Sequence, residues 1–63
     1  MITPNNLQVI DARKDAKLTQ QGAADVLGVH ITTWQKWESG QHKMGKATYA
    51  LFRIKTNSKK IPD

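Results

Sequence analysis

Residues 30–39 carry the side chains with the most evident chemistry, because hydroxyl, amide and ammonium groups fall on one side of a helix there. At about 100° per residue, the positions between about 100° and 240° from His30 form one face. The opposite side holds Trp34 and Trp37, which we expect to pack in a core. A helix face that only meets water is usually richer in Lys and Glu pairs, whereas these polar groups hydrogen-bond base edges and phosphates in a major groove. The face predicted to read nucleic acid consists of Ile31, Thr32, Gln35, Lys36 and Ser39.

Other segments of the chain have the residue types of catalytic or metal sites but lack the neighbouring residues and elements that such sites need. Residues 40–46 fit the first seven places of a phosphate-binding P-loop, yet Ala47 has no hydroxyl for Mg²⁺ and a helix, not a strand, comes first. Asp11 and Asp15 share a helix face, and in a chain too short for a pocket we expect them to be solvated. With no cysteine and two separated histidines, we predict no metal site. Because so short a chain has little room for a deep cavity, we also predict no enzyme activity, cofactor or small-molecule ligand.

Length and charge restrict the chain to one small, basic domain. Its 63 residues are 38% hydrophobic, which suffices for one core. Ten Lys and Arg against five Asp and Glu give a net charge of +5, which favours a polyanionic partner. No apolar run is long enough for a membrane span or a signal peptide, so we expect a cytoplasmic protein with no membrane contact. Residues 1–55 are predicted to form the domain, and residues 56–63 a flexible basic tail.

The elements that must position this face are four predicted helices. Their ranges run from Thr3-Pro4 to residue 15, then 20–27, 30–39 and 44–55. Thr19 is expected to cap the second helix, and Gly28 and Gly40 are expected to end the second and third in a left-handed conformation.

Apolar spacing predicts which side of each helix faces the core. Val9, Ala12 and Ala16 form the stripe of the first helix, with Leu18 just beyond its end. In the last helix one stripe holds Met44, Ala47, Leu51 and Ile54, and Tyr49 and Phe52 point away from it. We predict that Tyr49 and Phe52 make a two-fold dimer contact, with the rim of the core as the alternative.

A family resemblance rests on four short segments of the chain. Leu18-Thr19-Gln20-Gln21, Ala24, Leu27-Gly28-Val29 and Trp37-Glu38-Ser39-Gly40 together resemble the helix-turn-helix of the Cro and phage-repressor family. The resemblance covers residues 9–52. It implies an all-α, lambda-repressor-like fold of four helices, with a fifth missing or rudimentary, and it makes residues 30–39 the recognition helix.

The resemblance also implies roles for single residues. Base contacts fall to Ile31, Thr32, Gln35 and Lys36. Contacts to the DNA backbone fall to Gln20, His30, Ser39, Lys43 and Lys46, and Gln20 also braces the recognition helix. Arg13 and Glu38 are expected to form a structural ion pair. For His30, the residue type alone leaves a phosphate donor and a helix cap equally open.

Three positions depart from the family pattern. Gly22 stands where Glu is usual and weakens its helix by up to about 1 kcal/mol. Lys17 replaces a frequent Gly at a turn that needs positive φ. Ile31 is apolar where many relatives hydrogen-bond a base, and it is suited to a thymine methyl.

The function implied is a sequence-specific transcriptional regulator. We expect a Cro-like repressor of a phage or mobile element that binds palindromic double-stranded DNA as a homodimer. The alternative is an antitoxin-type module that binds DNA and holds a toxin. RNA binding is a weaker alternative, because RNA readers usually expose aromatic rings and both tryptophans are predicted to be buried.

Overall fold

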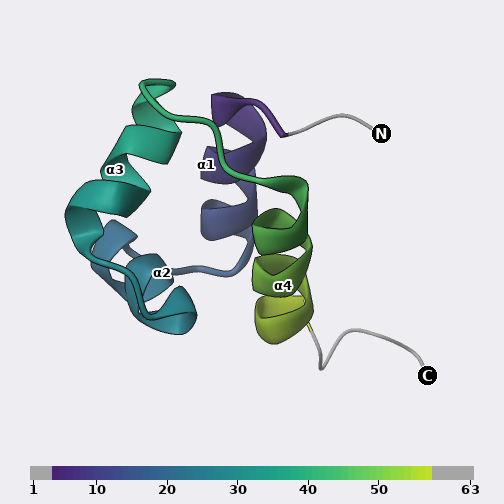
Figure 1. The fold of residues 1–63 in the computed structure, drawn as a ribbon. Coiled ribbons are helices and arrows are strands. Elements are labelled where there is room, and N and C mark those ends of the chain that lie inside the picture. Colours follow the sequence, from purple (N-terminus) through teal and green to yellow (C-terminus); the bar gives the residue numbers. More distant parts are fainter. Residues whose placement is uncertain (1–3, 58–63) are drawn as a thin grey trace.

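The computed structural model describes residues 4–57, which form four α-helices and contain no strand (Figure 1). The expected all-α fold of four helices is therefore confirmed. Residues 1–3 and 58–63, including most of the predicted tail, lie outside the described residues. The helices are α1 (Asn6–Asp15), α2 (Gln20–Leu27), α3 (Ile31–Ser39) and α4 (Lys46–Asn57).

The first helix begins later than predicted, because Asn5 rather than Thr3 precedes its first turn. The Asn5 side chain accepts a hydrogen bond from the Gln8 amide at 2.8 Å, and the Gln8 side chain accepts one from the Asn5 amide at 2.9 Å. This reciprocal pair satisfies two backbone donors that a helix start leaves free. Thr3 itself lies outside the described residues. The last helix also begins later, at Lys46 instead of Met44.

The turns around α2 and α3 follow the predicted chemistry. Thr19 caps α2 by accepting from the Gly22 amide at 3.0 Å. Gly28 and Gly40 end α2 and α3 with φ of 71° and 83°, in the left-handed region where glycine is least strained. Lys17, in the turn between α1 and α2, has φ of 61°, the positive value that the family resemblance implied for this turn.

The core lies where α2 packs against α3 and α4, and α1 packs against α3. The Trp34 indole is at its centre, with no exposed surface, and its ring centroid lies 4.9 Å from that of Phe52. Trp37 is half-buried and meets Trp34 edge to face at 5.7 Å. The buried hydrophobic residues are Val9, Ala12, Ala23, Ala24, Trp34, Met44 and Phe52.

The predicted orientation of α4 is wrong. Phe52 is fully buried and Tyr49 half-buried, while Leu51 and Ile54 are 45% and 57% exposed. Met44 is buried as predicted, but it precedes α4 and so does not set the rotation of that helix. The flat Phe52 ring fits against Trp34, which turns the aliphatic stripe outward. Phe52 therefore cannot belong to an exposed dimer contact.

None of the helices in residues 4–57 is long and apolar enough to cross a membrane.

Candidate nucleic-acid interface

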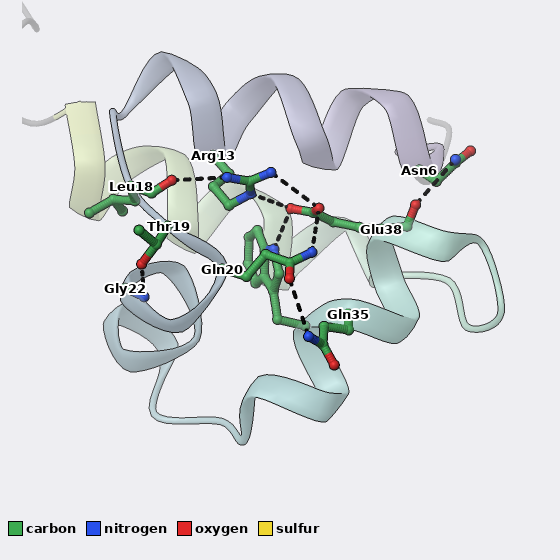
Figure 2. Close-up of polar contacts among 9 residues, drawn as sticks. Asn6, Arg13, Leu18, Thr19, Gln20, Gly22, Gln35 and Glu38 are labelled. Carbon is green, nitrogen blue, oxygen red and sulfur yellow. Dashed lines mark hydrogen bonds and ion pairs between the residues drawn. The ribbon is translucent and has the colours of Figure 1, made fainter.

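The polar centre of the molecule is the carboxylate of Glu38, near the end of α3. Its side chain is 8% exposed. Oε2 accepts from the Arg13 Nε at 2.5 Å and from the Trp34 indole nitrogen at 2.5 Å, and Oε1 accepts from the Gln20 Nε2 at 2.9 Å (Figure 2). The ion pair that the family resemblance implied for Arg13 and Glu38 is present in the structure.

These contacts keep Glu38 ionised. Burial opposes the charged form and would raise the pKa of Glu38. Hydrogen bonds from Arg13, Gln20 and Trp34, together with the positive charge of Arg13, outweigh burial and lower the pKa below its ordinary value. The carboxylate is therefore a permanent hydrogen-bond acceptor at neutral pH.

Arg13 joins three parts of the fold around this carboxylate. From α1 it reaches Glu38 in α3, and its Nη1 also donates to the backbone carbonyl of Leu18 at 3.0 Å, just before α2 (Figure 2). At the other end of α1, the Asn6 Nδ2 donates to the Glu38 carbonyl at 3.3 Å. The position of α3 relative to α1 and α2 is thus set by directional bonds as well as by packing.

Two successive hydrogen bonds lead from Glu38 to the surface of the molecule. Gln20, the first residue of α2, donates to Glu38 and accepts at its own Oε1 from the Gln35 Nε2 at 3.2 Å (Figure 2). Gln35 is exposed on α3. The bracing role implied for Gln20 is therefore visible as a bridge between α2 and the exposed side of α3.

The face of α3 predicted to contact bases is available to a partner. Thr32 and Gln35 are exposed, and Ile31 and Lys36 are half-buried. Ile31 also packs against the core, so only part of its side chain is free to meet a base. The structure brings these four residues together on two turns of one helix.

His30 caps α3 through its Nδ1, which accepts from the Thr32 amide at 3.1 Å. Of the two interpretations left open for His30, the structure contains the cap. The ring's Nε2 is then the nitrogen that carries the proton and can donate to a phosphate.

The other residues predicted to contact phosphates differ in whether their donor groups are free. The Ser39 hydroxyl donates to the Lys36 carbonyl at 3.1 Å and accepts from the Gln41 amide, so in this conformation it has no hydrogen left for a phosphate oxygen. Lys43 and Lys46 are exposed, in the loop after α3 and at the first position of α4. They lie outside the hydrogen-bonded group around Glu38.

Sequence reasoning missed the two bonds that organise this interface. Trp34 and Glu38 are four residues apart, a spacing that puts their side chains together on a helix, so their bond had a signal in the sequence. The Gln20 to Gln35 bond crosses between helices. The family resemblance implied that Gln20 braces the recognition helix, but nothing in the sequence named Gln35 as its partner.

One shallow cavity of about 320 Å³ opens between the start of α1 and the loop after α3, lined in part by Asn5, Trp37 and Lys43. Within residues 4–57, no three His, Cys, Asp or Glu side chains gather as a metal site.

Comparison with known proteins relates the chain to a segment of an enzyme. No family model matches it. It is 38% identical over 56 residues to the Type II methyltransferase M.MspI of a Moraxella species. The alignment covers 89% of this chain and 13% of the methyltransferase, so the chain spans a small part of that relative's length.

Proposed function

We propose that this chain is a sequence-specific DNA-binding regulator that places α3 in the major groove of double-stranded DNA. In this proposal it is a Cro-like repressor of a phage or mobile-element promoter, acting in the bacterial cytoplasm. Ile31, Thr32, Gln35 and Lys36 face the bases.

One observation carries the proposal: the exposed amide of Gln35 donates to Gln20, and Gln20 is itself anchored by its bond to the buried Glu38. A solvated glutamine loses side-chain entropy when it binds, whereas a tethered one has lost part of it already. Amide and hydroxyl groups on a rigid helix suit base edges, which demand fixed donor and acceptor positions.

Charge and helix geometry support the backbone contacts. The net charge of +5 attracts a polyanion. The first turn of α2 begins at Thr19 and Gln20, and the free amides of a helix N-terminus favour a phosphate. Gln20 keeps one Nε2 hydrogen after donating to Glu38, which suffices for a phosphate contact.

The test is selection of binding sites from a random duplex library, followed by footprinting on the DNA upstream of the chain's own gene. We expect enrichment of one palindromic sequence that also lies in that promoter. The affinity for it should fall with salt at a log-log slope of about 0.9 per phosphate contacted. A library from which no sequence is enriched would contradict the proposal.

Self-association is a separate part of the proposal, and the partner is a second copy of this chain. With nine residues, α3 is about 14 Å long and spans about four base pairs, so one copy reads little sequence. The exposed stripe of α4 is the surface proposed for this contact, because its apolar residues recur every three or four positions and so share one side of the helix. This α4 stripe consists of Ala47, Ala50, Leu51 and Ile54.

The similarity to M.MspI favours a second candidate function, in which the chain is an accessory segment that works with a methyltransferase. The aligned region is 13% of that protein, so the resemblance is to a segment and not to the whole enzyme. A selected binding site that coincides with a methylated sequence in the host genome, rather than with a promoter, would favour this candidate.

A further inference from the structure

We propose that the buried carboxylate of Glu38 determines which atoms Gln35 presents to DNA, and that Gln35 thereby selects adenine at one position of the binding site. The inference rests on the proposed function and adds a positioning residue to it. Glu38 acts through Gln20 and touches no base.

The first step is the orientation of the Gln20 amide. A carboxylate can only accept hydrogen bonds, so the group that Gln20 turns toward Glu38 must be its NH₂. The Nε2 to Oε1 distance of 2.9 Å agrees with this orientation. The carbonyl oxygen of Gln20 then points to the other side, toward α3 (Figure 2).

The second step transfers this orientation to Gln35. The Gln20 oxygen can only accept, so Gln35 turns its own NH₂ toward it, at 3.2 Å. Gln35 retains its Oε1 and one N–H for a partner. Figure 2 shows the Gln35 oxygen directed away from Gln20, and the side chain is exposed.

The third step matches those atoms to a base. Adenine offers an N6 donor and an N7 acceptor in the major groove, which pair with one acceptor and one donor of an amide. Guanine offers two acceptors, N7 and O6, and so requires two donors. With one Nε2 hydrogen engaged by Gln20, Gln35 fits adenine and opposes guanine.

The decisive variant is Gln20→Lys. Its ammonium donates to Glu38 and to the Gln35 oxygen, so Gln35 must turn over and present both hydrogens of its NH₂ outward. Sites selected from a random duplex library should change at one position from adenine to guanine, by about tenfold or more in relative affinity. Gln35→Ala identifies that position, because it should lose the adenine preference there and nowhere else.

Gln21→Lys is the matched control. Gln21 is the exposed neighbour of Gln20, and its Nε2 donates to the Asp25 carboxylate at 2.9 Å. It receives the same charge on the same helix without reaching Glu38 or Gln35. We expect its overall affinity for DNA to change and its preference for adenine to stay.

A further variant covers the case in which Gln20→Lys fails to fold, as judged by circular dichroism. Gln20→Met has no polar group to orient Gln35, so the preference for adenine over guanine should fall severalfold while the other positions of the site stay unchanged. Retention of the full adenine preference in a folded Gln20 variant, or a wild-type site without adenine at the Gln35 position, would overturn the inference. Absence of any enriched site for the wild-type chain would instead overturn the proposed function.

Discussion

Burying the carboxylate of Glu38 costs hydration free energy, and the hydrogen bonds that it accepts offset this cost. An isolated carboxylate removed from water loses several kcal/mol of hydration. Here three side chains donate to it, one of them the positively charged Arg13. The same bonds that offset burial also hold α1, α2 and α3 together, so the residue is structural and indirectly orients the exposed face of α3.

The lowered pKa of Glu38 predicts a pH dependence of folding. The folded-state value lies below the ordinary glutamate value of 4.5, so the unfolded chain binds this proton more readily. The stabilisation by Glu38 is therefore complete above about pH 5 and is lost as the pH falls through the folded-state pKa. Urea denaturation between pH 7 and pH 3 measures the loss.

Glu38→Gln is the control for this dependence. The variant should be less stable at pH 7, because Arg13 loses its ionic partner, and its stability should decline less between pH 5 and pH 3 than that of the wild type. Equal slopes for both proteins would show that other carboxyl groups cause the acid sensitivity.

Lys36 is the residue on α3 whose charge and position suit a guanine or a phosphate, and the two roles separate experimentally. If it reads a base, Lys36→Ala should cost about 1–3 kcal/mol on the selected site and relax preference at one position of each half-site. Lys14→Ala removes the same charge from α1 and should weaken binding to all sequences alike. An equal loss on selected and random DNA for Lys36→Ala would assign Lys36 to the backbone.

At the scale of elements, the turn between α1 and α2 is strained at one residue. Lys17 has φ of 61°, where a side chain costs roughly 1 kcal/mol relative to glycine. Lys17→Gly should therefore raise the free energy of unfolding by about 0.5–1 kcal/mol, measured by urea denaturation. Lys14→Gly, the same change inside α1, should lower it by about as much. A Lys17→Gly protein less stable than the wild type would contradict the strain.

The rotation of α4 shows where element-level reasoning from sequence fails. Leu51 and Ile54 continue an aliphatic pattern that starts at Met44, and that pattern predicted the inward face. Met44 precedes the helix and is buried independently of it. The rotation of α4 instead follows from Trp34, because its broad ring packs better against the Phe52 ring than against an aliphatic side chain.

At the scale of the whole molecule, the rotation of α4 moves the predicted dimer surface from Phe52 to the α4 stripe. Leu51→Lys should reduce self-association and weaken operator binding together, as measured by sedimentation and by DNA titration. Leu7→Lys is the matched control, because Leu7 is 63% exposed on α1 and is no part of that stripe. An unchanged oligomer would remove α4 from the interface, and a different protein co-purifying in equal amount would favour the antitoxin alternative.

The sequence by itself determined the number of helices, the caps at Thr19, Gly28 and Gly40, and the ionic partner of Glu38. Each depends on residues close together in the chain or, for the ion pair, on a family pattern. Tertiary structure decided the rotation of α4 and the hydrogen bond from Gln35 to Gln20. The cap at His30 is local, but the residue type left it open and the structure was needed to show it. Helical periodicity states which residues share a side, but the side that is buried depends on the shapes of neighbouring helices. The orientation of the Gln20 amide cannot be predicted from the sequence, because it is set by the Glu38 carboxylate on another helix.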